Sequence, residues 1–402
     1  MKWQTLFPGK RVYADAAAAM PLSQAAKKEL ERLWPLFGNP SALHKEALAA
    51  KKEFEAARAA VAGAIGAHAD EIVFTSSGTE ANNLALQGVL RPILLDRGEV
   101  GAVTSAIEHS SVTEPLRALE REGLYATKLH VDAEGIIDPM QLREVVGEDT
   151  ALVSIQMVNS EMGAVQDIRA IAKELRHARR SRTPQNEGKT WPLYLHTDAS
   201  QAPLWLPLNV EKLGVDLMTL DAQKVGGPKG VGALYLRRGT VLEPIILGGG
   251  QESGLRSGTE AVALAGAFAV ALVEAQENCE TNAARVSAAR DFLWSEIHRR
   301  IPSAILSGPK IRIANNLHIS IPNLSGEMAV IALDARGIAA STRSACDSAS
   351  GHPSHVLLAL GISPELAGSS LRLTLLPTAS RADALTIARA LESIVALYRH
   401  VL

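Results

Sequence analysis

The sequence of 402 residues predicts an α/β fold with a large, mostly parallel sheet, followed by a smaller α+β region at the C-terminus. Short apolar runs alternate with helix-like stretches through the first two thirds of the chain, a pattern typical of parallel sheets. A polar turn follows most of these runs. Ligands of such sheets bind beyond the carboxyl ends of the strands, so these turns are where a site is expected.

The apolar runs predict strands in the first part of the chain at residues 71–75, 100–105, 151–158, 193–196, 216–220 and 232–236. One long helical region is expected at 262–300. After it come strand-like segments at 317–321 and 371–375 and a closing helix from Arg381. The polar, turn-rich segment 179–192 predicts a surface loop. A chain of this length usually forms more than one core, and two domains are expected.

Charge and composition exclude several classes of function. The chain has 41 basic and 43 acidic residues and a net charge of -2, which argues against direct binding of nucleic acid. The N-terminus lacks the apolar core of a signal peptide. The longest apolar run, 261–273, is too short to span a bilayer and predicts a buried helix. Two cysteines cannot form a disulfide framework, so a cytoplasmic location and no membrane association are expected.

Two residues at neighbouring strand ends suggest a cofactor. Lys224 follows a strand and precedes Gly226, Gly227 and Pro228, where backbone and ligand can approach closely. A partly desolvated lysine can form a Schiff base, whereas the alternative is a solvated loop lysine. Asp198 ends the preceding strand, where a carboxylate needs a partner such as a pyridinium nitrogen; the alternative is a turn cap.

Polar turns after two earlier strands could complete such a site. The segment 76–80 (SSGTE) opens a helix, and its backbone N–H groups and hydroxyls around Gly78 and Thr79 could hold a phosphate. The same letters also fit a simple helix cap. His109 could stack on a flat ring and move protons, or it could be structural. Asn159 and Glu161 could bind a ring hydroxyl or a substrate.

Two further residues are candidates for the reaction itself. Cys346 lies in a small, polar stretch, 339–352, that predicts an exposed loop, and exposure suits a nucleophile. Cys279, in a helical stretch, is interpreted as incidental. Arg372 lies in a strand-like apolar run and needs a partner there. A substrate carboxylate and an internal salt bridge are equally compatible with that position.

The motifs taken together resemble the cysteine desulfurases, a branch of the class V aminotransferase-like enzymes that depend on pyridoxal 5'-phosphate. The resemblance covers nearly the whole chain, and the loop with Cys346 is similar to that of the long-loop group. Its ordered motifs lie at residues 13–21 (YADAAAAMP), 38–44 (GNPSALH), 76–83 (SSGTEANN), 108–109, 158–167 (VNSEMGAVQD), 196–201, 224–232 (KVGGPKGVG), 248–259 (GGGQESGLRSGT) and 344–350 (SACDSAS).

The resemblance implies a fold and a set of partners. The fold would be the aspartate aminotransferase-like type I fold, with a seven-stranded sheet in a large cofactor-binding domain at 15–262. Residues 1–14 and 263–402 would form the small domain that carries the cysteine loop, about 339–353. L-cysteine would be the substrate, a scaffold or tRNA-thiolation protein the sulfur acceptor, and the chain would form a homodimer. No metal is expected.

The resemblance also implies roles for individual residues. Lys224 would carry the Schiff base and move the Cα proton, and Cys346 would attack the substrate sulfur to leave a persulfide and alanine. A protonated His109 is the candidate for lowering the pKa of that thiol. Other residues would hold the cofactor. Asp198 would pair with the pyridinium, Gln201 would bond the ring hydroxyl, and His109 would stack on the ring. Gly78 and Thr79 would bind the phosphate together with Thr259 of a second subunit, and Gln223 would also contact the cofactor. Asn159 and Arg372 would bind the substrate carboxylate.

The chain departs from the family pattern at three places. Asp221-Ala222-Gln223 replaces the usual Ser and His ahead of the lysine, and an Asp near a phosphate would repel it unless turned away or bridged by a cation. Gln251 replaces a His, and Ala19-Met20 a Thr pair. Three alternatives therefore stay open: another class V aminotransferase or lyase, a selenocysteine lyase, and a degenerate member that only binds or scaffolds.

Overall fold

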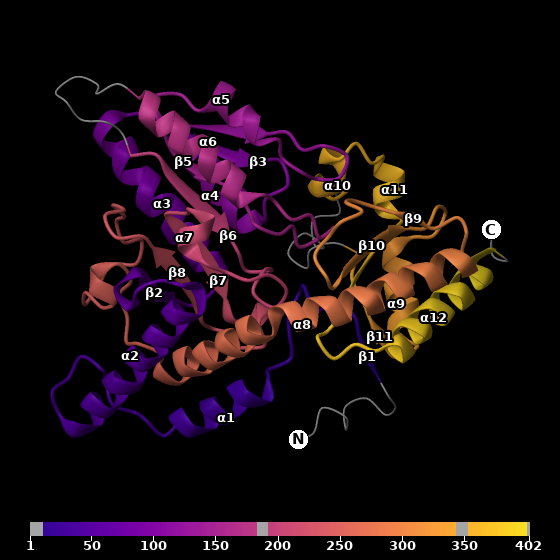
Figure 1. Ribbon diagram of the computed structural model, residues 1–402, viewed down its shortest axis with the longest axis horizontal. Coiled ribbons are helices and arrows are strands. Elements are labelled where there is room, and N and C mark those ends of the chain that lie inside the picture. The colour runs from indigo at the N-terminus through magenta and orange to yellow at the C-terminus, as the bar shows by residue number, and fades with distance from the viewer. Residues whose placement is uncertain (1–10, 183–191, 343–352, 400–402) are drawn as a thin grey trace.

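The computed structural model describes residues 11–182, 192–342 and 353–399. A seven-stranded sheet forms the larger part of the molecule (Figure 1), with the strand order β2-β8-β7-β6-β5-β3-β4. Strand β8 runs antiparallel to both of its neighbours, and the other neighbouring pairs are parallel. The strands are β2 (Ile72–Thr75), β3 (Val100–Ser105), β4 (Leu124–Leu129), β5 (Thr150–Ser154), β6 (Tyr194–Asp198), β7 (Leu217–Asp221) and β8 (Gly232–Leu236).

Helices cover both faces of this sheet. Side chains of α3 and α4 form one apolar cluster with alternate residues of the strands, and α2, α6 and α8 pack against the residues between them. Both faces are therefore dry, which explains why β2, β3, β5 and β7 are buried along their whole length. The helices of this part are α1 (Gln24–Leu33), α2 (Lys45–Ile65), α3 (Gly78–Arg97), α4 (Ser110–Glu120), α5 (Leu142–Val145), α6 (Ile168–Ser181), α7 (Val210–Leu213) and α8 (Val262–Arg300).

The C-terminal part forms a smaller layered unit. Strands β12, β10 and β9 make an antiparallel sheet, and the N-terminal β1 pairs with β11 beside it. Helices α9 and α12 cover this unit (Figure 1). Its elements are β1 (Val12–Tyr13), β9 (Ile305–Leu306), β10 (Asn316–Ser320), α9 (Gly326–Asp334), β11 (Ile338–Ala339), α10 (His355–Ala359), α11 (Pro364–Gly368), β12 (Ser370–Thr374) and α12 (Arg381–Arg399).

Helix α8 joins the two parts. It contacts α1 and α2 near its start and α12 near its end, so it crosses the molecule (Figure 1). Among the described helices it is the one long and apolar enough to cross a membrane by length and composition. Its apolar side chains, among them Phe268, Leu272 and Leu293, are buried in the protein core. This placement agrees with the buried helix that the sequence predicts.

The sequence predicts most of these elements. Strands β3 and β8 have the expected bounds, α8 covers 262–300, and α12 begins at Arg381. The structure differs from three expectations. The loop expected at 179–192 overlaps α6, which continues to Ser181. The strand expected at 151–158 ends at Ser154, although the backbone N–H groups of Ile155 and Met157 still donate to carbonyls of β6. Strand β4 was not predicted, because its middle residues are exposed and the apolar pattern is broken there.

Candidate active site

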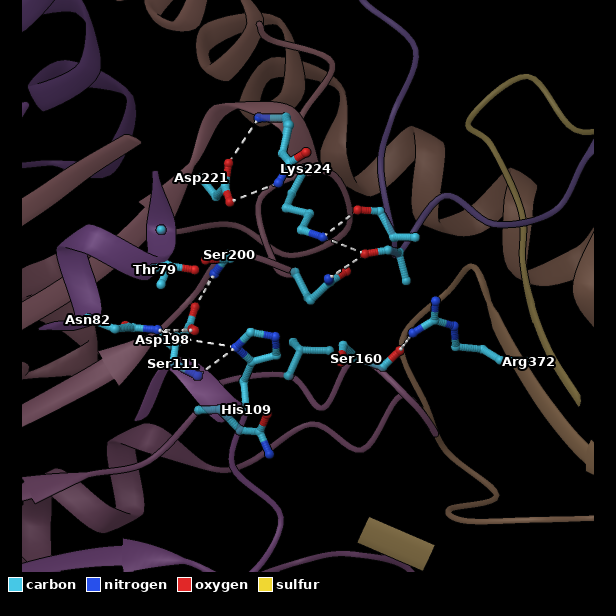
Figure 2. Close-up of a pocket in the computed structure, with 17 residues that line it drawn as sticks. Thr79, Asn82, His109, Ser111, Ser160, Asp198, Ser200, Asp221, Lys224 and Arg372 are labelled. Carbon is cyan, nitrogen blue, oxygen red and sulfur yellow. Dashed lines mark hydrogen bonds between the residues drawn. The ribbon is translucent and has the colours of Figure 1, made fainter. Parts of the chain in front are cut away.

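A pocket lies at the carboxyl end of the large sheet (Figure 2). Its walls come from the loops after β3, β5, β6 and β7, from the start of α3, and from two segments of the smaller unit. The pocket thus lies where ligands of parallel α/β sheets bind.

The structure brings Lys224 and Asp198 into this one pocket. Asp198 is the last residue of β6, and Lys224 lies in the 3-10 turn Ala222–Lys224 that follows β7. The two strands are parallel neighbours, with Asp198 opposite Thr219. Parallel pairing places both strand ends at the same edge, which is the arrangement that a cofactor shared by these side chains requires.

Hydrogen bonds fix the carboxylate of Asp198. Its Oδ2 accepts a bond of 2.7 Å from the side-chain amide of Asn82, and its Oδ1 accepts one of 2.9 Å from the backbone N–H of Ser200. The same Asn82 amide donates to the hydroxyl of Ser111 at 2.8 Å. Asn82 Oδ1 is buried and has no partner among the described residues. The carboxylate therefore has one orientation, and an acceptor at the pocket wall is left for a ligand.

His109 caps the start of α4 and lines the pocket (Figure 2). The backbone N–H of Ser111 donates to His109 Nδ1 at 3.1 Å, and the Ser111 hydroxyl lies 2.7 Å from the same nitrogen. Because Nδ1 accepts, the neutral ring carries its proton on Nε2. The preceding residue, Glu108, is fully buried, and burial raises its pKa to about 8 despite bonds from Ser105 and the Gln156 backbone.

Lys224 is held by the opening motif of the chain. Its Nζ donates to the carbonyls of Ala17 and Ala18, both at 2.7 Å. Gln201 Nε2 donates to the Ala17 carbonyl at 3.0 Å. The segment 17–18 thus closes one side of the pocket and holds the lysine amine inside it. The side chains of both alanines are small, which leaves the backbone carbonyls accessible to the lysine.

The start of α3 forms the expected cradle. Ser77 caps the helix by accepting a bond from the backbone N–H of Glu80, and Gly78 and Thr79 line the pocket. A Cβ on Gly78 would lie 3.1 Å from the hydroxyl of Ser200 and 3.2 Å from Asp221 Oδ2. The glycine therefore leaves room that any side chain would fill. Free N–H groups at a helix start suit a phosphate.

Arg372 lies on β12 and reaches the pocket from the smaller unit (Figure 2). Its side chain is 1% exposed and forms an ion pair of 2.9 Å with Asp15, and its NH1 donates to the Ser160 carbonyl at 3.2 Å. Nε is buried without a partner among the described residues. The internal salt bridge is therefore present, and the guanidinium still borders the space where a substrate carboxylate would bind.

Cys346 lies outside the described residues, but the chain on either side of it is anchored at the pocket. Before it, Ser341 exchanges two backbone hydrogen bonds with Arg372. After it, His355 Nε2 lies 3.0 Å from the carbonyl of Glu108. Arg372 itself lines the pocket, and Glu108 precedes the pocket residue His109. The cysteine segment thus leaves and re-enters the described chain beside the pocket.

Cys279 cannot take the role of Cys346. It is 3% exposed within α8, and burial raises the pKa of its thiol. A buried thiol with a raised pKa is a poor nucleophile.

Two expected site residues, Asn159 and Thr259, do not line the pocket, and Gln251, which replaces the usual His, has its own contact. Asn159 is buried beside the pocket and holds its own loop, since Nδ2 donates to the Ile107 carbonyl and Oδ1 accepts from the N–H groups of Glu161 and Met162. Thr259 is exposed and does not line this pocket. Gln251 accepts from the N–H of Gly258. Contact of Asn159 or Thr259 with a ligand stays a prediction.

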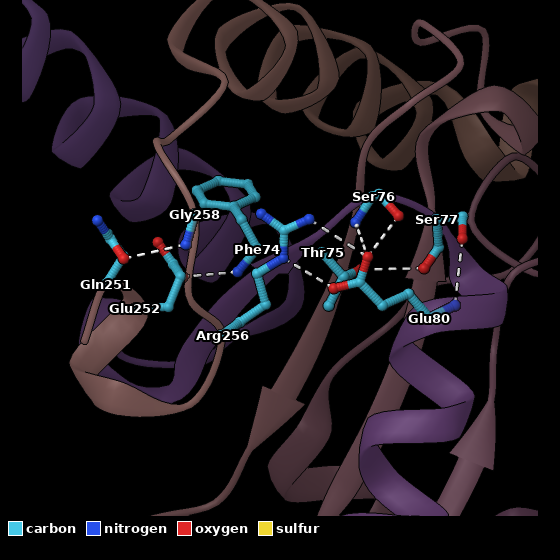
Figure 3. Close-up of polar contacts among 9 residues, drawn as sticks. All are labelled: Phe74, Thr75, Ser76, Ser77, Glu80, Gln251, Glu252, Arg256 and Gly258. Carbon is cyan, nitrogen blue, oxygen red and sulfur yellow. Dashed lines mark hydrogen bonds and ion pairs between the residues drawn. The ribbon is translucent and has the colours of Figure 1, made fainter. Parts of the chain in front are cut away.

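The segment that carries Gln251 and Thr259 is fixed by two ion pairs. Figure 3 shows the pair between Arg256 and Glu80 and the bond from Phe74 to Glu252. Glu252 binds Arg58 through two contacts of 2.7 Å and also accepts from the N–H of Phe74. Arg256 binds Glu80 of α3 at 2.8 Å. Glu252 has a positive φ of 51°, a strained backbone angle that this pairing holds in place.

Sequence reasoning missed several pocket residues. Asn82 lies within the quoted motif 76–83, but its contact with Asp198 joins residues 116 positions apart. Ser111 and Ser200, which also line the pocket, and Asp15, the ion-pair partner of Arg372, are equally ordinary polar residues in the sequence. The available signal was position alone: Asn82, Asp15 and Ser200 lie within the quoted motifs, and Ser111 lies two residues after one.

The residues of the pocket fit pyridoxal phosphate, the cofactor that the sequence implies. Lys224 offers an amine, Asp198 a fixed carboxylate, His109 an aromatic ring, and the start of α3 a phosphate cradle. The unpartnered Asn82 Oδ1 shows that the polar wall is built for a further group. One feature of the cradle, the carboxylate of Asp221, is unfavourable for a phosphate.

Comparisons with known proteins identify the family of the chain. The pattern described as aminotransferase class-V matches residues 12–385. A cysteine desulfurase IscS of Dictyoglomus turgidum is 40% identical over 372 residues, covering 91% of this chain and 90% of the relative. A solved NifS-like protein is 31% identical, with a TM-score of 0.87 over 96% of this chain and all of the other.

A second solved structure, SspA in complex with cysteine, is 31% identical, with a TM-score of 0.77 over 92% of this chain and 99% of the other. These matches extend over nearly the whole chain and include both of its parts. The chain therefore belongs to the class V aminotransferase family of pyridoxal-phosphate-dependent enzymes, and within it to the cysteine desulfurases.

Proposed function

We propose that this chain converts L-cysteine to L-alanine and takes the sulfur onto Cys346 as a persulfide. The Cys346 thiolate would form an S–S bond to the substrate sulfur while the Cβ–S bond breaks and leaves its electron pair on carbon. That carbon takes up a proton to give alanine. The sulfur is oxidised as the carbon is reduced, so the reaction needs no external redox partner.

The shared pocket of Lys224 and Asp198 is the observation that carries this proposal. When bound, pyridoxal phosphate supplies an electron sink for the bonds around the substrate Cα. The carboxylate of Asp198, oriented by Asn82 and Ser200, would keep the ring nitrogen protonated. That charge is what makes the ring a strong acceptor of electrons.

Other residues would position the substrate and move its protons. Lys224 Nζ would hold and return the Cα proton, because its amine is kept inside the pocket by the carbonyls of Ala17 and Ala18. His109, with its proton on Nε2, would stack on the ring and donate toward the substrate sulfur. Arg372 would bind the substrate carboxylate with the side of its guanidinium that borders the pocket.

The anchors of the cysteine segment support the transfer of sulfur to Cys346. Ser354 donates to the buried Glu161 at 2.6 Å, and the neighbouring His355 contacts the Glu108 carbonyl. Ser341 is paired with Arg372 at the other end. Both ends are therefore held at the pocket, within a short chain length of the thiol.

The first experiment compares Cys346→Ser with Cys279→Ala. Alanine and sulfide are measured after addition of L-cysteine and a reductant, and mass spectrometry of the trapped protein locates the extra sulfur. Cys346→Ser should lose alanine production by at least about 100-fold while it keeps its visible cofactor band. Cys279→Ala should retain both activities, because that thiol is buried away from the pocket.

Normal sulfide release by Cys346→Ser would refute the persulfide role. Formation of a keto acid in place of alanine would identify an aminotransferase, and a clear preference for selenocysteine would identify a selenocysteine lyase. A purified protein that stays colourless with added pyridoxal phosphate would indicate a degenerate member. Each of these outcomes differs from the expected one in a directly measured product or spectrum.

We further propose that the sulfur serves iron–sulfur cluster assembly or tRNA thiolation through an acceptor protein, and that the enzyme is a homodimer. The identity of 40% to a cysteine desulfurase IscS supports the first of these roles. The exposed position of Thr259, outside the pocket of its own chain, supports a second subunit as its partner. Incubation with candidate acceptors, followed by detection of sulfur on them, tests the assignment.

A further inference from the structure

The phosphate cradle of this protein contains a carboxylate. Asp221 ends β7 opposite Gly232, is 8% exposed and lines the pocket. A Cβ on Gly78 would lie 3.0 Å from Asp221 Cβ and 3.2 Å from its Oδ2. The carboxylate thus lies beside the start of α3, where the phosphate of a cofactor would bind.

Local bonds hold the carboxylate in this position. Asp221 Oδ1 accepts from the backbone N–H of Gln223 at 3.1 Å, and the side-chain amide of Gln223 lies 3.4 Å from Oδ2. These contacts close the 3-10 turn that positions Lys224. Turning Asp221 away from the cradle would break the turn, so the side chain stays beside any bound phosphate.

The surrounding charges do not remove the conflict between two anions. Lys224 lies on the same turn, but its Nζ is held by two carbonyls, and Asp198 at the end of β6 is a further anion in the pocket. His109 and Arg372 line the pocket from α4 and β12. On α3 the nearest charged side chain, Glu80, is bound to Arg256 and Ser76.

Burial makes protonation the least costly way to resolve this conflict. It raises the pKa of Asp221 above its ordinary value, although Lys224, Gln223 and the backbone of Gly78 act in the opposite direction. A phosphate in the cradle would raise the pKa of Asp221 further, because a second anion beside the carboxylate disfavours its ionised form. A neutral carboxyl can also donate its O–H to a phosphate oxygen.

We propose that Asp221 takes up a proton from solvent when a phosphate group enters the cradle, so that cofactor binding weakens as the pH rises. The inference rests on the proposed function, since it assumes that this cradle holds the phosphate of pyridoxal phosphate. Its sign follows from linkage. The pKa of Asp221 would be higher in the complex than in the free protein. At pH values between the two, binding requires uptake of a proton, and protons become scarcer as the pH rises.

The test uses the full chain with Lys224→Ala, which removes the covalent link and its own titration. Dissociation constants for pyridoxal phosphate and for pyridoxal are measured by calorimetry from about pH 6 to about pH 9. A second chain carries Asp221→Asn as well. In the chain that retains Asp221, the dissociation constant of pyridoxal phosphate should rise with pH by up to about tenfold more per pH unit than in that second chain. Pyridoxal, which lacks the phosphate, should show no such difference.

Proton uptake gives an independent readout on the chain that retains Asp221. Calorimetry of pyridoxal phosphate binding in two buffers of different ionisation enthalpy should detect uptake of up to one proton that Asp221→Asn lacks. Asp70→Asn is the control, because Asp70 is an exposed carboxylate paired with Arg238 on the surface. The Asp70→Asn chain should take up the same number of protons on binding pyridoxal phosphate as the chain that retains both Asp70 and Asp221.

Equal pH slopes with Asp221 and with Asp221→Asn, or no difference in proton uptake, would overturn the role of Asp221 and leave the proposed function intact. A difference abolished by added magnesium ions would also overturn it, because a bridging cation would then replace the proton. Failure of pyridoxal phosphate to bind any of these chains, even at the lowest pH, would overturn the proposed function together with this inference.

Discussion

At the scale of single residues, the pocket depends on buried polar groups that fix one another. Asp198 has a defined orientation only because Asn82 and Ser200 donate to it. Asn82 is in turn bonded to Ser111, which fixes the tautomer of His109. A change at one member therefore alters the others, and effects of single substitutions in this group should not be additive.

Glu108 provides a pH-dependent test of this buried group. Its pKa is raised to about 8 by burial, so the folded protein keeps a proton that the unfolded chain loses near pH 4.5. Stability should therefore fall as the pH rises between these values, and Glu108→Gln should remove that loss. At about pH 8 or above, the substitution should raise the free energy of unfolding by several kcal/mol, on the order of 4.

Urea unfolding at a series of pH values measures this difference, with Glu114→Gln as the control. Glu114 is exposed and paired with Arg117, so its substitution should give a small difference that does not change over this range. The buried His196, whose pKa burial lowers to about 4, is common to all these proteins, and its contribution cancels. If the stability of Glu108→Gln changed with pH in the same way as that of the unsubstituted protein, the raised pKa of Glu108 would be contradicted.

At the scale of elements, the ends of strands and the starts of helices place the chemistry. Strands β6 and β7 deliver Asp198 and the turn with Lys224 to one edge, and α3 and α4 begin at that edge. The segment after β8 is tied to this framework by Glu252 and Arg256 rather than by a strand (Figure 3). Its position therefore depends on ion pairs.

Removal of Glu252 should be costly. The guanidinium of Arg58 lies over the rings of Phe54 and Phe74, 4.9 Å and 5.2 Å from their centres, and Glu252 is its buried partner. Glu252→Ala leaves the buried Arg58 with only the half-exposed Glu55 as an ionic partner and should lower the free energy of unfolding by about 3–5 kcal/mol. Chemical denaturation measures the change.

Glu55→Ala is the matched control, because Glu55 binds the same Arg58 at 3.0 Å but is half exposed. Water replaces much of an exposed ion pair, so its loss should cost about 1 kcal/mol or less. Equal losses for the two substitutions would show that the burial of Glu252 adds nothing to the pair.

At the scale of the whole molecule, α8 joins the two units, and large apolar side chains are exposed between α1 and α2. Four large apolar side chains in one short stretch, from the end of α1 into the start of α2, are mostly exposed: Trp34 71%, Phe37 84%, Leu43 91% and Leu48 53%. Exposed clusters of this kind mark association surfaces. We expect the proposed second subunit to bury this surface.

Phe37→Asp and Leu43→Asp should therefore shift the protein from dimer to monomer by introducing unpaired charges into the contact. Analytical ultracentrifugation over a range of concentrations measures the dissociation constant, which should rise at least about 100-fold, as for loss of an interface hot spot. Leu95→Asp is the control, since Leu95 is 77% exposed on α3 and isolated from this stretch. A dimer unchanged by all three substitutions would place the interface elsewhere.

The sequence by itself determined the order of strands and helices along the chain and the residues Lys224, Asp198, His109 and Arg372 as candidates. These are local signals: apolar runs end at polar turns, and parallel sheets collect those turns at one edge. Strand β4 escaped because its exposed middle residues break the pattern, and Asn82 because its partner is 116 positions away.

Only the tertiary structure decided how these residues pair. It placed Lys224 against the carbonyls of the opening motif, gave Arg372 an ion pair with Asp15 across 357 positions, and turned the Asp221 carboxylate toward the start of α3. The physical reason is that hydrogen bonds and ion pairs depend on distances and angles between segments remote in sequence. Those distances are set by how the whole core packs, which no local pattern of residues contains.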